Sequence, residues 1–256
     1  MIDNQGLSMT RILLLGGTTE ASRLARALAE NGADAVFSYA GRTASPAAQP
    51  LPMRVGGFGG ADGLARYLRE ENITRVVDAT HPFAAQMSTN AVAACAQVGV
   101  ALAALERAPW RAGEGDFWLH AKDMPAAVDA LPEDPARVFL ASGKQHRDLF
   151  ASTPQRHSVL RLVDHPDGAL PLPEASVVIA RGPFDADVDT ALMRTHGITH
   201  VVAKNAGGVG AEAKLIAARR LGVPIIMIDR PPVPPRRILR SVDQVMAWLD
   251  HAAESS

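Results

Sequence analysis

Short apolar runs alternate along the chain with segments whose apolar residues recur every three or four positions. In the first half, these runs have the length of strands that are buried on both faces. Strands are predicted at residues 11–15, 35–39, 53–55, 75–78 and 100–104, with helices at about 19–31, 61–70 and 84–97. Such an alternation is typical of a parallel sheet covered by helices. The pattern therefore predicts an α/β domain over residues 9–108.

The alternation restarts after a break at residues 107–116, which are rich in glycine and proline. Strands are predicted at residues 117–120, 137–141, 158–162, 176–180, 200–203 and 224–228, with helices near 123–130, 144–150, 185–196 and 210–221. A second α/β domain is therefore expected over residues 112–230. The remaining residues, 231–256, begin with the stiff proline-rich connector 231–235 and continue with an amphipathic helix at about 242–250, which can pack on either domain.

The fold class that follows is α/β with two domains, each built on an open parallel sheet. Right-handed crossovers between consecutive strands make such sheets doubly wound. A chain of 256 residues is also long for a single hydrophobic core. Ligands of doubly wound sheets bind outside the carboxyl ends of the strands. We therefore expect the two sheets to face each other, with the active site in the cleft between the domains.

The first predicted strand ends at Gly16 and Gly17, followed by Thr18, Thr19 and a helical pattern. Backbone N–H groups and the positive end of the helix dipole converge at such a turn, which makes it an anion site. In a doubly wound sheet this turn usually binds a nucleotide diphosphate. The glycine spacing departs from G-x-G-x-x-G, so an ordinary structural turn is the alternative interpretation.

The end of the second predicted strand bears on which nucleotide would bind. NAD sites usually place a carboxylate there for the ribose 2′-hydroxyl, whereas NADP sites place a cation there for the 2′-phosphate. Residues 38–43 contain no Asp or Glu, and Arg42 follows the flexible Gly41. This favours NADP over NAD and counts against S-adenosylmethionine. The alternative is that Arg42 is a solvated loop residue.

Two further loops at the predicted carboxyl edge carry candidate binding residues. Residues 56–60 place four glycines around Phe58, which allows close approach to a flat ligand or simply makes a flexible loop. Residues 78–84 place His81 directly before Pro82 at a strand end, where it could donate a hydrogen bond to a substrate carboxylate. In the alternative interpretation Thr80 or His81 only caps the following helix, whose first turn Pro82 suits.

The second domain repeats the combination of a strand, a glycine turn and a helix at residues 204–214, which we interpret as a second anion site. Cations also follow two further strands of this domain, with Lys144 in the run 142–144 and Arg181 in the run 181–184. Each feature alone could be ordinary turn chemistry. Their recurrence at one edge predicts a binding surface for a polyanion.

Composition and missing motifs narrow the function. A net charge of −1 provides no general attraction for nucleic acid or an anionic membrane. The single cysteine, Cys95, is read as a small buried helix residue, and no metal site is expected. A signal peptide and an 18-residue apolar run are both missing, so a cytoplasmic location is expected. Hydride transfer remains consistent with this sequence, because the cofactor supplies that chemistry and the protein only has to orient it.

Several of these motifs together resemble the precorrin-6A reductase family. They are GGTTEA at 16–21, SYAGRT at 38–43, GGFGG at 56–60, DATHPFA at 78–84, RAPW at 107–110, RGPF at 181–184 and KNAGGVGAEAK at 204–214. The resemblance spans residues 9–250 in the expected order. It implies an enzyme of cobalamin biosynthesis that uses NADPH to reduce one double bond of the precorrin-6A macrocycle, giving precorrin-6B. It also implies two Rossmann-like domains with the tetrapyrrole between them and possible hand-over to neighbouring pathway enzymes.

The resemblance also implies roles for individual residues. Gly16, Gly17, Thr18 and Thr19 would hold the pyrophosphate and Arg42 the 2′-phosphate, and the cofactor set also includes Thr43 and Thr80. The substrate set comprises His81, Pro82, Phe83, Ser142, Gly143, Lys144, Arg181, Gly207, Gly208 and Lys214. Hydride would go to a ring carbon and a proton to its neighbour. His81 and Lys204 are the candidate catalytic residues, although water could also supply the proton.

Two alternatives from other functional classes stay open at this point. One is an NADP-dependent reductase of a smaller acid, against which the two anion-binding edges argue. The other is a non-catalytic module that senses a nucleotide, because Rossmann-like folds also serve as sensors.

Overall fold

The computed structural model describes residues 10–40, 47–140, 156–162, 175–180 and 184–253. The chain divides into two compact units. Unit 1 combines residues 1–107 with residues 232–256, and unit 2 comprises residues 108–231. The C-terminal segment therefore belongs with the first half of the chain.

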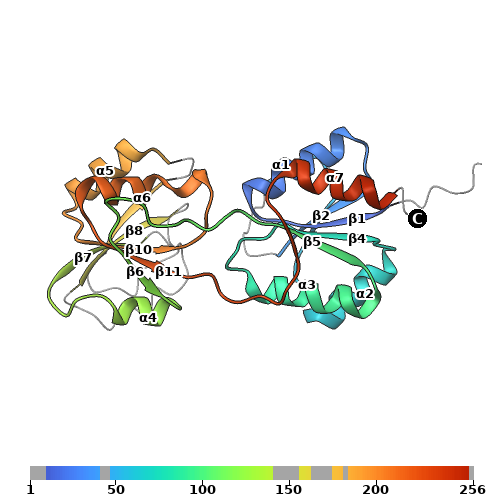
Figure 1. The fold of residues 1–256 in the computed structure, drawn as a ribbon, viewed down its shortest axis with the longest axis horizontal. Helices are drawn as coiled ribbons and strands as arrows, with labels where there is room; N and C mark the ends of the chain where they lie inside the picture. The colour runs from blue at the N-terminus through green and yellow to red at the C-terminus, as the bar shows by residue number, and fades with distance from the viewer. Residues whose placement is uncertain (1–9, 41–46, 141–155, 163–174, 181–183, 254–256) are drawn as a thin grey trace, which may run out of the picture. The chain divides into compact units, whose positions relative to one another are not determined.

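Unit 1 is built on a six-stranded parallel sheet, labelled in Figure 1. Its strands are β1 (Ile12–Leu15), β2 (Ala35–Tyr39), β3 (Met53–Val55), β4 (Arg75–Asp78), β5 (Ala101–Leu105) and β12 (Arg237–Leu239). They lie in the order β12-β5-β4-β1-β2-β3, so the chain reverses its direction of winding between β1 and β4. This is the strand order of a doubly wound nucleotide-binding sheet, and it places the predicted binding edge at the β1–β4 switch point.

The alternating side chains of β1 explain why helices cover both faces of this sheet. Ile12 and Leu14 pack in one core cluster with residues of α1 (Thr19–Glu30) and α7 (Val242–Ala253). Leu13 and Leu15 pack on the opposite face in a cluster with residues of α2 (Gly60–Glu70) and α3 (Ala85–Val98). Figure 1 shows these two helical layers on either side of the strands. Because both faces are buried, the strand reads as one apolar run.

Unit 2 contains a second parallel sheet of six strands. Its strands are β6 (Trp118–Ala121), β7 (Ala136–Leu140), β8 (Arg156–Leu162), β9 (Ala175–Ile179), β10 (His200–Lys204) and β11 (Ile225–Ile228), in the order β6-β11-β10-β7-β8-β9. Its helices are α4 (Met124–Asp129), α5 (Ala186–Thr195) and α6 (Ala213–Leu221). The helix predicted at residues 144–150 lies outside the described residues. The α/β prediction with two open parallel sheets is confirmed.

The sixth strand of the sheet in unit 1 comes from a distant part of the chain. After β5 the chain enters unit 2 as β6, which pairs with β11, and after β11 it returns to unit 1 as β12, which pairs with β5. β12 was not predicted from the sequence, because its three residues form no apolar run. The helix predicted to begin at residue 210 begins instead at Ala213, after the 3-10 helix η2 (Val209–Ala211).

The lone cysteine lies inside unit 1. Cys95 is a buried residue of α3, and burial raises the pKa of its thiol to about 12. The thiol therefore stays protonated at neutral pH, which does not suit a nucleophile. Among the described residues, we find no helix with the length and apolar character that a membrane span requires.

Candidate functional site

The turn between β1 and α1 uses its two glycines for different reasons. A Cβ on Gly16 would lie 2.0 Å from the buried ring of Phe37, so the packing of the sheet excludes a side chain there. Gly17 has a φ of +125° and would direct a Cβ into space where no atom lies within 4 Å. Gly17 therefore keeps an unusual backbone conformation beside open space, as a ligand-binding turn requires.

Thr18 fixes the start of α1 and ties it to the neighbouring strand. As the N-cap, its hydroxyl oxygen accepts a hydrogen bond from the Ala21 N–H at 3.1 Å. The same hydroxyl donates to the Ala79 carbonyl just beyond β4, at 2.8 Å. Thr19, the first residue of the helix, is exposed. The N-terminus of α1 thus lies at the switch point, and a helix N-terminus at this place is a site that can bind phosphate.

A buried carboxylate, which the sequence analysis missed, holds the turn after β4. The Oδ1 atom of Asp78 accepts hydrogen bonds from the Thr80 N–H at 3.1 Å and from the Thr80 hydroxyl at 2.7 Å. Its Oδ2 accepts from the Ser88 hydroxyl at 2.6 Å and lies 3.9 Å from Nε of Arg236. The Arg236 guanidinium also donates to Glu106 at 2.7 Å. Asp78 therefore fixes the conformation of Thr80 from within the protein.

His81 follows Thr80 on the surface of unit 1. Its imidazole is exposed, and Nδ1 accepts a hydrogen bond from the Phe83 N–H at 3.2 Å. In the neutral ring this places the proton on Nε2. The expectation that Thr80 or His81 caps the following helix is wrong, because α3 begins at Ala85 and its N-cap is Ala84. Pro82 precedes the helix and lies outside its first turn.

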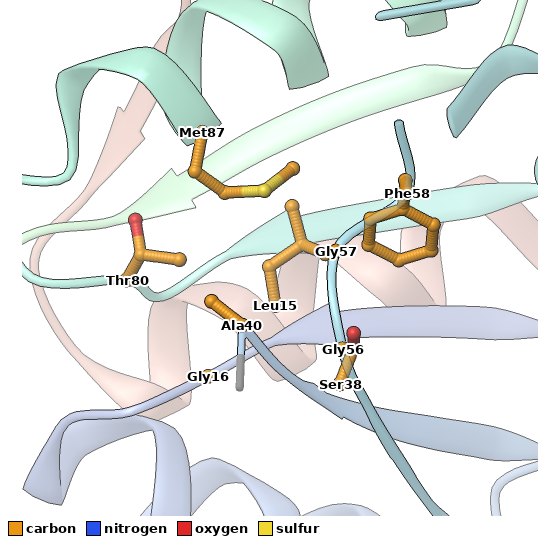
Figure 2. A pocket seen from close by; sticks show the side chains of 9 residues that line it. All are labelled: Leu15, Gly16, Ser38, Ala40, Gly56, Gly57, Phe58, Thr80 and Met87. Carbon is orange, nitrogen blue, oxygen red and sulfur yellow. The ribbon is translucent and has the colours of Figure 1, made fainter. Parts of the chain in front are cut away.

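A pocket opens beside the β1–α1 turn, and Figure 2 shows its side chains. Its lining residues are Leu15, Gly16, Ser38, Ala40, Gly56, Gly57, Phe58, Thr80 and Met87. They come from the ends of β1, β2, β3 and β4 and from α3, so the pocket lies at the carboxyl edge of the sheet. This pocket joins two predicted features, the first glycine turn and the loop 56–60. Arg42 and Thr43 lie outside the described residues.

In unit 2, other residues of the same unit occupy the space beside the turn after β10. The buried amide of Asn205 accepts from the Trp110 N–H at 2.8 Å and donates to the Trp110 carbonyl at 3.0 Å. Gly207 has a φ of +71°, and a Cβ there would lie 2.1 Å from the Ala108 carbonyl oxygen and 2.7 Å from the Arg230 guanidinium. The indole N–H of Trp110 donates to the Gly208 carbonyl at 3.0 Å. The segment entering unit 2 thus packs against this glycine turn.

Lys214, predicted to bind substrate, and Lys204, a candidate catalytic residue, differ in their surroundings. Lys214 is buried, donates to the Ala211 carbonyl and lies with its ammonium 4.9 Å from the centre of the Trp110 ring. Lys204 is the partly exposed last residue of β10. Four other predicted substrate residues of this unit lie outside the described residues: Ser142, Gly143, Lys144 and Arg181. The substrate roles of this set stay predictions.

Comparison with known proteins gives consistent matches over nearly the whole chain. The family model described as "Precorrin-6x reductase CbiJ/CobK" matches residues 11–250. A precorrin-6A reductase of Rhodobacter capsulatus is 67% identical over 246 residues, which cover 96% of this chain and 98% of that protein. A precorrin-6A reductase of Rhodococcus erythropolis is 46% identical over 245 residues, covering 94% and 98% of the two chains.

A solved structure described as "CobK precorrin-6A reductase" has a TM-score of 0.90 and 66% sequence identity, and the match covers 95% of this chain and 97% of that one. The similarity therefore extends through both units. On these grounds the chain belongs to the precorrin-6x reductase family, CbiJ/CobK.

Proposed function

We propose that this chain reduces one double bond of precorrin-6A with NADPH, giving precorrin-6B in cobalamin biosynthesis. The observation that carries the proposal is the 67% identity to a precorrin-6A reductase across almost the full length of both proteins. A reductase of this family requires a nicotinamide cofactor. Identity on this scale, extending through both units, also argues against a reductase of a smaller acid.

The β1–α1 turn fits the cofactor on physical grounds. Gly17 leaves open space beside the start of a 12-residue helix, and the Thr18 cap leaves the other first-turn N–H groups available. Residues 16–19 would hold the pyrophosphate there. Arg42 and Thr43 would hold the 2′-phosphate, because the strand before them ends without an acidic residue. When bound, NADPH supplies the hydride.

Residues at the end of β4 are assigned to positioning and to substrate binding. The Thr80 hydroxyl donates to Asp78, which fixes the Thr80 side chain at the edge of the pocket that it lines. With its proton on Nε2, the exposed His81 can donate a hydrogen bond to a carboxylate of the macrocycle. Lys144 and Arg181 would bind acetate or propionate groups of the substrate.

The reaction consumes one hydride and one proton, which add to neighbouring ring carbons. His81, Lys204 or water could deliver the proton at the substrate. A general acid typically contributes about 10²–10⁴-fold to the rate, whereas one binding contact contributes less. The size of the fall in rate when His81 or Lys204 is replaced by alanine therefore distinguishes a proton donor from a binding residue.

The preference for NADPH is tested with the variant Arg42→Ala. A guanidinium–phosphate contact is worth roughly 1.5–3 kcal/mol, so the KM for NADPH should rise about 10–150-fold while that for NADH barely changes. Kinetics with precorrin-6A and each cofactor measure this, with the exposed Arg26→Ala as a control. An equal loss with both cofactors would contradict the assignment. Binding of NADPH by the wild type without any reduction of precorrin-6A would instead favour a nucleotide sensor.

A further inference from the structure

Arg54, in the middle of β3, makes several contacts with the loop that follows its own strand. Its Nη1 donates to the Ser38 hydroxyl at 3.2 Å and to the Gly56 carbonyl at 2.7 Å. Its Nη2 donates to the Gly57 carbonyl at 3.1 Å. A guanidinium has five N–H donors in a rigid plane, so these three hydrogen bonds fix its orientation.

The same guanidinium stacks on an aromatic side chain of that loop. Its central carbon lies 3.8 Å from the centre of the Phe58 ring and 5.2 Å from that of Tyr67. The two rings meet edge to face with their centres 5.1 Å apart, and Tyr67 belongs to α2. Arg54 thus holds Phe58 against the helix as well as fixing the backbone on either side of it.

These contacts matter because all the acceptors, and the stacked ring, belong to the pocket. Ser38, Gly56, Gly57 and Phe58 are four of the residues that line it. The loop contains four glycines, and a chain rich in glycine has many accessible conformations when nothing holds it. Gly56 and Gly59 even adopt positive φ values of +124° and +83°. The pocket wall therefore depends on a side chain from outside the loop.

We propose that Arg54 is a positioning residue for the nucleotide, which acts by holding residues 56–58 as a preformed wall of the pocket. This inference rests on the proposed function, because it takes the pocket as part of the cofactor site. A preformed wall raises affinity, since the bound nucleotide does not have to order the loop. Because Arg54 acts through the loop, its loss should weaken the binding of NADPH and of NADH to the same extent.

The test compares two substitutions that separate charge from geometry. Arg54→Met removes the charge and the hydrogen bonds, whereas Arg54→Lys keeps the charge but loses the planar donor group. Both variants should bind NADPH and NADH about 10-fold more weakly, with kcat at saturating cofactor within about twofold of the wild type. Titration calorimetry and kinetics with precorrin-6A measure these quantities. Arg69→Met, in the last turn of α2, is the control and should change nothing.

Each of the following results would overturn the inference. Unchanged affinity in Arg54→Lys would show that charge alone suffices, and a loss confined to NADPH would make Arg54 a ligand of the 2′-phosphate. A lower melting temperature with normal affinity would leave only a structural role. If both Arg54 variants fail to fold, Phe58→Leu and Ser38→Ala each remove one contact of Arg54 and should weaken the binding of NADPH and NADH about 2–5-fold. Normal affinity in both of these variants would also overturn the inference. A wild-type protein that binds neither cofactor would refute the proposed function itself.

Discussion

The glycine turn after β1 in unit 1 and the glycine turn after β10 in unit 2 look alike in sequence but differ in their surroundings. At Gly17 a Cβ would meet no atom within 4 Å, whereas at Gly207 it would lie 2.1 Å from the Ala108 carbonyl oxygen. Both residues have positive φ values. The first turn leads directly into a capped helix, and the second leads into the 3-10 helix η2.

This difference shows that a strand followed by glycines has two physical explanations. In unit 1 the missing side chain leaves space that a ligand can occupy. In unit 2 the missing side chain lets the segment containing Trp110 pack against the turn. The Asn205 side chain accepts a hydrogen bond from the Trp110 N–H, and Arg230 donates to the Asn205 carbonyl. The glycine motif alone does not distinguish these cases, because both need a backbone conformation that other residues rarely adopt.

The largest effect is expected on stability from Gly207→Ala. The new methyl group would clash with backbone, and the positive φ adds strain, so unit 2 should lose roughly 3 kcal/mol of unfolding free energy. Chemical denaturation measures this loss, and NADPH affinity in the folded protein should stay normal. Gly210→Ala is the matched control, because a Cβ there meets nothing within 4 Å. Wild-type stability in Gly207→Ala would mean that the turn in unit 2 is open as well.

The next effect concerns affinity in unit 1. Gly17→Val should weaken NADPH binding by about 100-fold or more, because the side chain would occupy the space proposed for the pyrophosphate. Equilibrium titration with NADPH measures this. Gly32→Val is the control, because Gly32 also has a positive φ and open space but lies at the other end of α1. If both variants lose stability equally and Gly17→Val binds NADPH normally, the turn is only structural.

A smaller effect is expected from His81→Ala at the end of β4. Loss of one charge-assisted contact should raise the KM for precorrin-6A about 5–150-fold, which corresponds to roughly 1–3 kcal/mol, with little change for NADPH. Steady-state kinetics with each substrate varied in turn give both values. Full activity with an unchanged KM would leave His81 without a substrate role. A fall in turnover of about 10²–10⁴-fold with a shifted pH profile would mark it as a general acid.

The strands buried on both faces were predictable because each reads as a continuous apolar run. β2 and β4 have the predicted bounds, and β1 begins one residue later. The edge strand β3 also has the predicted bounds, although Met53 and Val55 are exposed. β12 was missed because the segment Arg237–Leu239 is short and largely exposed. It forms a strand only because it pairs with the edge of β5. Pairing with a distant edge is a tertiary effect that local propensity does not contain.

Residues of the candidate site could be predicted from the sequence where their contacts lie within one turn. They could not be predicted where their contacts are with residues distant in the sequence. Gly17 and Thr18 were identified from the strand that precedes them and the helix that follows. Asp78 reads simply as the last residue of a strand, yet its carboxylate is bonded to Ser88, ten residues further on. Arg54 reads as a polar strand residue, but its contacts converge on a pocket built from several strands. Such convergence appears only in the folded chain.

The central claim is that the open glycine turn of unit 1 binds the cofactor and the packed glycine turn of unit 2 does not. Amide hydrogen exchange of the full chain, with and without saturating NADPH, tests it most directly. We predict slower exchange at residues 17–22 and 56–60 and unchanged exchange at residues 207–212. Protection of residues 207–212 without protection of residues 17–22 would contradict the account.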